Sequence, residues 1–272
     1  MVDASKLHTL EPLFYPGGDE PKPETNKNHL RLYGHNLCPF VARARNALAL
    51  KGIPFQEVHL DLNNKAKWHL DLNGGFVPIL ELQTGELIIE SAIVATFAEE
   101  FAKDSGVHLI PADPLAAAKM RVEMTKFDAT MNPVWGIVMA RYADDAKTQA
   151  FKEQTLPKWE ALATQTGGGW LSGTPEPNML DVHVASMWDF MYAPLTNEGE
   201  IFTHVRGLTD VTNTAPNWVA YVERFRAHVL LNKYRFRKLA VEKHGIRSAG
   251  WPKDEKCQLS LAVLEGVFEV EP

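Results

Sequence analysis

The stretch from Leu30 to Ala47 constrains the fold more than any other part of the chain. It begins with an apolar run typical of a buried strand, turns after Gly34, and continues beyond Cys38-Pro39 with apolar residues at helical spacing. Proline is favoured at the first position of a helix, because its missing N–H would have no helical partner there. The pattern therefore predicts a strand, a turn and a helix, with Cys38 at the N-terminus of the helix.

This position gives Cys38 a candidate chemical role. The free N–H groups and the positive end of the helix dipole stabilise an anion, and they can lower the pKa of a thiol from about 8.5 by several units. Because the thiolate is the nucleophile of cysteine chemistry, Cys38 is a candidate for covalent chemistry with sulfur, with a buried structural cysteine as the alternative. Val41 stands where a C-x-x-C motif has its second cysteine, so an external thiol would have to resolve any mixed disulfide.

The rest of the chain divides into three parts. Prolines and glycines among charged residues predict an irregular N-terminal extension over residues 1–28. Residues 29–109 then show the order β-α-β-α-β-β-α, which includes a hairpin at Thr84-Gly85. From 114 to 272 the patterns are helical and end in an ambiguous tail. The expected helical segments are 115–142 with a bend near Pro133, 146–165, a helix capped by Asn178 and Asp181, and one or two helices over 218–243.

Composition excludes several function classes. The net charge is −6, and no basic run interleaves with aromatics, so nucleic acid is not an expected partner. No apolar run is long enough for a signal peptide core or a membrane span. Cys38 and Cys257 are far apart and share no metal-ligand spacing with the histidines, so we expect neither a disulfide framework nor a metal. A reducing, cytoplasmic location is the natural expectation.

Several short motifs together resemble the cytosolic glutathione transferases. These motifs are Cys38-Pro39-Phe40, Lys51-Gly52-Ile53, Asn64-Lys65, Trp68, Val77-Pro78, Glu81, Gly85 and Glu90-Ser91. Cys-Pro-Phe is similar to the omega class, which uses a cysteine where most classes use tyrosine or serine. The sequence Asn73-Gly74-Gly75-Phe76 departs from the usual Asn-Pro pattern of the family. The resemblance implies an α/β thioredoxin-like N-terminal domain (βαβαββα) followed by an all-α C-terminal helical domain.

The resemblance also implies a glutathione site. Cys38 would form a mixed disulfide with glutathione, and Phe40 would pack beside the tripeptide. Val77, turned outward by a cis peptide bond to Pro78, would pair with the cysteinyl part like an added strand. The charged and polar ends of glutathione would be held by Lys65 at the glycyl carboxylate, Glu90 at the γ-glutamyl ammonium and Ser91 at the γ-glutamyl carboxylate.

Each of these residues also has a simpler interpretation. Glu90-Ser91 can be a helix cap, Lys65 a solvated lysine, Pro78 a trans edge proline and Phe40 part of the core. It is their joint spacing that favours a binding site. His35 could influence the Cys38 thiol or have no role in the site.

A second substrate would sit between the two domains. The aromatic residues that could line its pocket are Phe127, Trp135, Trp188 and Tyr192. Aromatic residues at helical spacing are more often core, and we prefer that interpretation.

The function implied is that of a glutathione-dependent thiol transferase or dehydroascorbate-type reductase, with a role in detoxification and a homodimeric assembly. Two alternatives stay open. One is a conventional conjugating transferase in which a hydroxyl, such as that of Tyr33, activates the glutathione thiol. The other is a non-enzymatic relative, similar to chloride intracellular channel proteins or ligand-binding scaffolds. Arg43, Arg45 and Asn46 interrupt the apolar surface that a channel-like role would require of the first helix.

Overall fold

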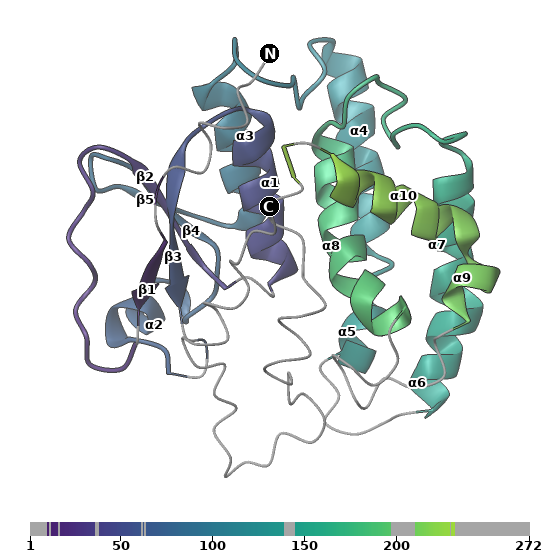
Figure 1. Cartoon of the computed structure of the whole chain (residues 1–272), viewed down its shortest axis with the longest axis horizontal. Coiled ribbons are helices and arrows are strands. Elements are labelled where there is room, and N and C mark those ends of the chain that lie inside the picture. Colours follow the sequence, from purple (N-terminus) through teal and green to yellow (C-terminus); the bar gives the residue numbers. More distant parts are fainter. Residues whose placement is uncertain are drawn as a thin grey trace. The chain divides into compact units, whose positions relative to one another are not determined.

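The computed structural model divides into two compact units, one holding the residues up to Leu109 and the other those from Ile110 to His228. Figure 1 shows strands and helices in the first unit and helices in the second. The described residues are 10, 12–15, 17–35, 38–60, 62, 64–138, 145–196, 210–228 and 230–231.

A five-stranded mixed sheet organises the first unit. The strand order is β1-β3-β2-β4-β5, in which β3 pairs parallel with β1 and β2, and β4 pairs antiparallel with β2 and β5. Helices α1 and α3 pack against each other beside this sheet (Figure 1). The elements are β1 (Leu13–Tyr15), β2 (Leu30–Gly34), α1 (Pro39–Leu50), β3 (Phe55–Leu60), α2 (Lys67–Asn73), β4 (Ile79–Glu81), β5 (Leu87–Ile89) and α3 (Ser91–Phe101).

Strand β1 lies inside the stretch that the sequence predicted to be an irregular extension. Its three residues pair with β3, with Leu13 opposite Val58 and Tyr15 opposite Leu60. Three apolar residues bounded by prolines are too short for the alternation that identifies strands, so the pattern missed this one. The prediction of irregular structure is therefore wrong for residues 13–15.

Helix α1 begins where the sequence predicted and ends at a glycine. Pro39 occupies the first position after Cys38, and the apolar positions that the helical spacing identified are buried. At the other end Gly52 has a φ of +70°, and the N–H of Ile53 donates to the carbonyl of Leu48 at 3.0 Å. This is the left-handed glycine that commonly ends a helix.

One face of the sheet is covered by α2 through Trp68. Tyr33 is the register partner of both Val58 and Ile79, so the three side chains share a face. The Trp68 indole meets the Tyr33 ring edge-to-face at 5.6 Å and donates a hydrogen bond of 3.0 Å to the Tyr15 hydroxyl. This aromatic cluster ties β1 and α2 to the middle of the sheet.

The second unit is helical, as predicted, but its helices are shorter than the sequence patterns suggested. The 115–142 pattern contains two helices separated by a turn at 129–131, where Thr130 bonds back to the Phe127 carbonyl. A π-helical segment precedes Pro157, whose ring nitrogen has no hydrogen to donate. The elements are α4 (Pro114–Asp128), α5 (Asn132–Val138), α6 (Asp145–Ala150), the π-helical segment (Phe151–Thr155), α7 (Leu156–Thr164), α8 (Met179–Thr196), α9 (Val211–Thr214) and α10 (Pro216–Ala227).

The predicted cap of α8 is confirmed. The N–H of Leu180 donates to Asn178 Oδ1 at 2.9 Å, and the N–H of Asn178 donates to Asp181 Oδ2 at 3.0 Å. The two side chains therefore accept hydrogen bonds from backbone N–H groups at the start of the helix, in a variant of the capping box. The predicted helical stretch beyond His228 and the ambiguous tail over 258–270 lie outside the described residues.

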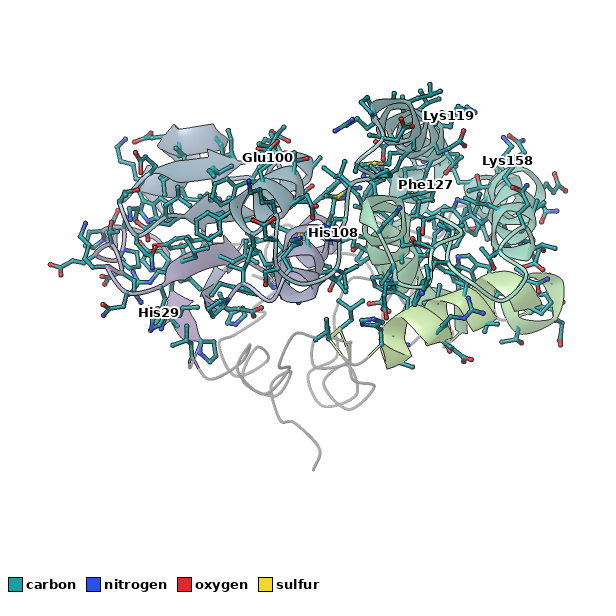
Figure 2. The ribbon with its side chains drawn as sticks, turned by 90° about the horizontal axis from the view of Figure 1, so that it is seen from above. His29, Glu100, His108, Lys119, Phe127 and Lys158 are labelled. Carbon is teal, nitrogen blue, oxygen red and sulfur yellow. The ribbon has the colours of Figure 1, made fainter. Side chains whose placement is uncertain are left out.

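Aromatic rings form the core of the helical unit. Trp159 stacks on Phe127 and Trp218, at 6.3 and 6.0 Å between centroids, and lies 5.9 Å from Trp188. Figure 2 shows Phe127 among the helices of this unit, whereas Lys119 and Lys158 point away from it. Large buried aromatics supply much of the apolar area that stabilises a helical domain.

Candidate functional site

Cys38 stands at the junction between β2 and α1, as predicted. It is the residue before the first turn of α1, and its own N–H donates to the His35 carbonyl at 2.9 Å. Its thiol accepts from the backbone N–H groups of Phe40 and Val41, and the residue is partly exposed. The sequence therefore located a free cysteine at a helix N-terminus.

The electrostatic balance at Cys38 differs from the expectation. Burial raises the pKa of the Cys38 thiol above its ordinary value. The N–H groups of Val41 and Phe40 and the guanidinium groups of Arg45 and Arg43 act in the opposite direction, but they do not outweigh the loss of solvation. The predicted lowering of the Cys38 pKa is wrong. The sequence indicated the helix N-terminus, but it did not indicate the burial that desolvates the thiol.

Arg43 connects the Cys-Pro-Phe segment to the start of α3. Its Nη1 donates a hydrogen bond of 3.2 Å to the hydroxyl of Ser91, and its guanidinium lies 5.6 Å from the centre of the Phe40 ring. Ser91 is buried, and Phe40 is an exposed aromatic. The predicted residues Cys38, Phe40 and Ser91 therefore belong to one connected part of the first unit.

Glu90 has an unusual backbone conformation just before α3. Its φ is +71°, the single positive value recorded for a non-glycine residue among those the structure describes. The Glu90 side chain is exposed and makes no capping hydrogen bond, so the simple helix-cap interpretation does not hold for this carboxylate. Strained backbone of this kind is concentrated at ligand-binding positions.

The Val77–Pro78 peptide bond is cis, as the resemblance implied. The preceding loop is held by side chains of α2. The Phe76 carbonyl is bonded to the His69 ring at 2.8 Å and accepts from Asn73 Nδ2 at 3.0 Å, while the Phe76 N–H donates to Asn73 Oδ1 at 3.2 Å. These contacts fix the backbone that leads into Val77, just before β4 begins at Ile79.

Lys65 lies beside the same loop. It precedes α2, is half-buried, and places its ammonium 5.8 Å from the centre of the Phe76 ring. This distance is within the range of a cation–π interaction. Lys65 is therefore not the freely solvated lysine of the simpler interpretation.

The hydroxyl of Tyr33 is poorly suited to the alternative mechanism, in which a hydroxyl activates the glutathione thiol. The residue is fully buried, and its hydroxyl donates a hydrogen bond of 2.8 Å to Glu81 Oε2. Burial, together with the Glu81 carboxylate, raises the pKa of Tyr33. A phenol with a raised pKa ionises less readily, so it is a poor activator of the glutathione thiol.

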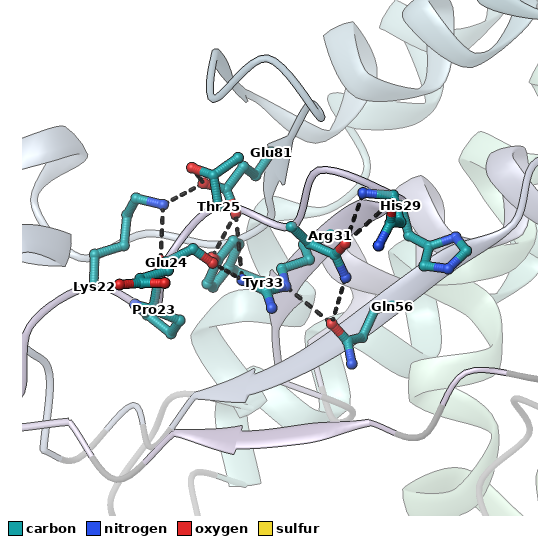
Figure 3. A network of polar contacts seen from close by, with 11 residues as sticks. Lys22, Pro23, Glu24, Thr25, His29, Arg31, Tyr33, Gln56 and Glu81 are labelled. Atoms are coloured by element: carbon teal, nitrogen blue, oxygen red, sulfur yellow. Dashed lines mark hydrogen bonds and ion pairs between the residues drawn. The ribbon is translucent and has the colours of Figure 1, made fainter.

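Glu81 is the centre of the polar network in Figure 3. Besides Tyr33, its carboxylate accepts from Thr25 Oγ1 at 2.9 Å and pairs with Lys22. Burial opposes the charged form, yet hydrogen bonds from Lys22, Tyr33 and Thr25 hold the pKa of Glu81 below its ordinary value. The network fastens the N-terminal segment to the sheet.

The sequence reasoning missed a buried polar group on α1 and β3. Arg45 Nε lies 2.5 Å from Glu57 Oε1, and His59 Nε2 lies 3.3 Å from Glu57 Oε2. Burial lowers the pKa values of His35 and His59 to about 4. The arginines that interrupt the apolar surface of the first helix were the available signal, since a buried arginine needs a carboxylate partner.

The four aromatic residues proposed for a second-substrate pocket all lie in the helical unit. Phe127 and Trp188 are buried in its aromatic core, which corrects their placement in a pocket lining and agrees with the core interpretation. Trp135 packs on Phe190, and Tyr192 donates a hydrogen bond to Glu223.

The described residues contain neither a metal-binding group nor a membrane-spanning helix. Within those ranges, no group of histidine, cysteine and acidic side chains is arranged to hold a metal ion. None of the helices traced there has the length and apolarity needed to cross a bilayer.

Comparison with known proteins identifies relatives of this chain. A family model described as the glutathione S-transferase N-terminal domain matches residues 37–100. Glutathione S-transferase omega-1 of Sus scrofa is 32% identical over 148 residues, which cover 53% of this chain and 59% of the relative. Glutathione S-transferase U6 of Arabidopsis thaliana is 30% identical over 167 residues, covering 59% and 71%.

A solved structure also resembles this fold. Rice GST1, determined in complex with glutathione, superposes with a TM-score of 0.63 at 21% identity and covers 79% of this chain and 93% of its own. The match to the mammalian omega-1 relatives spans between 53% and 66% of their length. The first unit has the thioredoxin-like arrangement and the second the helical domain of these proteins. The chain belongs to the glutathione S-transferase family.

Proposed function

We propose that this protein is a glutathione-dependent thiol transferase and dehydroascorbate-type reductase that acts through a mixed disulfide between Cys38 and glutathione. The observation that carries the proposal is the free cysteine Cys38, a partly exposed residue at the start of α1, in the position of the Cys-Pro-Phe motif. The omega-class names of several relatives agree with it.

The binding mode follows from the residues around Cys38. Glutathione would lie along the backbone of Val77, with its γ-glutamyl end at Glu90 and Ser91 and its glycyl carboxylate at Lys65. The exposed carboxylate of Glu90 suits an ammonium, and the N–H groups of the first turn of α3 suit a carboxylate. Phe40 offers an exposed ring beside the cysteine.

The reaction is a pair of thiol–disulfide exchanges. The Cys38 thiolate attacks the glutathione sulfur of a mixed disulfide, forms the Cys38–glutathione disulfide and releases the other sulfur as a thiolate, which takes up a proton. A second glutathione thiolate then attacks the bound glutathione sulfur, releasing glutathione disulfide and returning the Cys38 thiolate. Together, the mixed disulfide and one glutathione give the free thiol of the substrate and glutathione disulfide. Reduction of dehydroascorbate would instead consume two glutathione molecules, which supply its two electrons and two protons and leave as glutathione disulfide.

The ionisation of Cys38 limits the first step. Burial raises the pKa of this thiol, so its thiolate forms less readily than that of an exposed cysteine. Because exchange requires the thiolate, the rate should increase with pH until the Cys38 pKa is reached. The pH profile therefore reports on this residue.

Intact-mass spectrometry after treatment with oxidised glutathione tests the proposal. We expect one glutathione adduct on the wild-type chain and on Cys257→Ser, and none on Cys38→Ala. Disulfide reduction at the expense of glutathione should disappear with Cys38→Ala and persist in Cys257→Ser. Retained reductase activity in Cys38→Ala would rule out this mechanism, and glutathione binding without any turnover would favour a binding protein.

The conjugating alternative has a separate test. Because the buried Tyr33 hydroxyl donates to Glu81, we expect Tyr33→Phe to leave conjugation of chlorodinitrobenzene unchanged. An increase of that activity in Cys38→Ala would favour a hydroxyl elsewhere in the site. Cytoplasmic location and a homodimer accompany the proposal and follow from the family alone.

A further inference from the structure

The side chain of Lys65 lies directly over Gly75. A Cβ atom added to Gly75 would come within 2.5 Å of Lys65 Cδ, which is closer than real side chains approach. Gly75 also has a φ of +74°, a conformation that favours glycine. Glycine at this position therefore leaves the space through which the lysine side chain passes.

Phe76 supports the end of the same side chain. The Lys65 ammonium is 5.8 Å from the centre of the Phe76 ring, and that ring is 72% exposed. The backbone of Phe76 is held in place, because it bonds to Asn73 in both directions and to the His69 ring. An aromatic ring this exposed adds little to a core, so its contact with the cation is the interaction that distinguishes it from an aliphatic residue.

We propose that Gly75 and Phe76 are positioning residues that hold Lys65 toward the glycyl carboxylate of glutathione, and that they make the site selective for the tripeptide over the dipeptide γ-glutamylcysteine. This inference rests on the proposed function, in which Lys65 binds that carboxylate. The segment Asn73-Gly74-Gly75-Phe76, where the sequence departs from its relatives' usual Asn-Pro, thereby acquires a role in recognition.

Calorimetric binding of reduced glutathione and of γ-glutamylcysteine to the full chain tests the inference. The wild type should bind glutathione about tenfold or more tightly than γ-glutamylcysteine, because a carboxylate bonded to an ammonium is a strong contact. Phe76→Leu should weaken glutathione binding about three- to fivefold and leave γ-glutamylcysteine binding unchanged. Phe76→Trp, which keeps an aromatic face, should preserve the glutathione affinity.

The two adjacent glycines provide a matched pair. Gly75→Ala forces Lys65 to move. Gly74 has a comparable positive φ of +72°, but a Cβ added there would lie 3.4 Å from the Phe76 ring, which is an ordinary contact distance. Both substitutions carry a similar backbone cost, and Gly75→Ala also crowds Leu70 Cδ2 at 3.0 Å, so Gly75→Ala should lower the thermal midpoint at least as much as Gly74→Ala. Only Gly75→Ala should reduce the preference for glutathione over γ-glutamylcysteine.

A double-mutant cycle separates positioning from general damage. In a Lys65→Met background, Phe76→Leu should have no further effect on glutathione binding, because the ring acts through the lysine. Equal weakening of both peptides by Phe76→Leu would overturn the inference. So would a wild type that binds both peptides equally well, a result that leaves the Cys38 mechanism intact. A wild type that binds neither peptide would overturn the proposed function and this inference with it.

Discussion

Arg43 donates a hydrogen bond of 3.2 Å to the hydroxyl of Ser91 and so joins the helix that begins after Cys38 to the helix that begins at Ser91. The two helix N-termini are the places where the proposed site handles a thiolate and a carboxylate. A single buried guanidinium thus contributes positive charge to both.

Replacing Arg43 should therefore make Cys38 harder to ionise. In Arg43→Gln, the loss of a nearby cation raises the pKa of the thiol further, so alkylation by iodoacetamide at pH 8 should slow by about two- to fivefold. The measurement is the rate of mass increase across a pH series in a Cys257→Ser background. An unchanged pH profile would show that Arg43 does not influence the thiol.

Glu81 should contribute mainly to stability. Glu81→Gln leaves Lys22 without its carboxylate partner and weakens the hydrogen bond from Tyr33, which predicts a loss of about 2–4 kcal/mol in the free energy of unfolding. Tyr33→Phe removes the hydrogen bond to Glu81 Oε2 but leaves the carboxylate in place, and it should cost about 1–2 kcal/mol. Urea denaturation measures both changes. The prediction fails if Glu81→Gln proves no more destabilising than Tyr33→Phe.

The buried histidines predict a particular loss of stability in mild acid. The pKa values of His35 and His59 are about 4 in the folded protein, compared with about 6.5 for an unfolded histidine. Between these values the unfolded chain binds protons that the folded chain does not. The free energy of unfolding should therefore fall as the pH drops from about 6.5 to about 4, by up to about 1.4 kcal/mol per pH unit for each histidine.

Urea titrations at several pH values in that range test this prediction. His35→Gln and His59→Gln should each flatten the dependence, and the surface substitution His108→Gln controls for the loss of a histidine. A free energy of unfolding that does not vary between pH 6 and 4.5 would contradict the burial of these two imidazoles.

We expect Tyr15 to stabilise the segment around Trp68, which follows Lys65 of the proposed site. Its hydroxyl accepts from the Trp68 indole at 3.0 Å, and Trp68 lies three residues after Lys65. Tyr15→Phe removes this bond and should lower stability by about 1 kcal/mol. If the segment also orders Lys65, glutathione binding should weaken while γ-glutamylcysteine binding stays constant. Loss of stability without any change in that preference would separate the two roles.

The sequence predicted the parts of the fold in which local chemistry decides the structure. Pro39 and Gly52 delimit α1, and Asn178 caps α8, because each signal acts within one helical turn. The strand Leu13–Tyr15 escaped prediction because three apolar residues bounded by prolines are too short to show alternation, so only their pairing with β3 identifies them as a strand. Local patterns carry no information about such long-range pairing.

The candidate site shows the same division. The position of Cys38 at a helix start followed from Pro39, yet the direction of its pKa shift did not, since burial depends on the packing of the whole unit. The contact between Lys65 and the Phe76 ring could not be predicted either, because it depends on side chains of α2 that hold the loop containing Phe76.

Strand β1 has a consequence for any shortened form of this chain. It is the outermost strand of the sheet, three residues long, and it covers the six-residue strand β3. A protein that starts after residue 28 would expose the backbone donors and acceptors of residues 58–60, with which β1 pairs, and an open strand edge favours pairing with a strand of another molecule. The segment before the Cys-Pro-Phe motif therefore shields this part of the sheet edge, independently of any part it takes in binding.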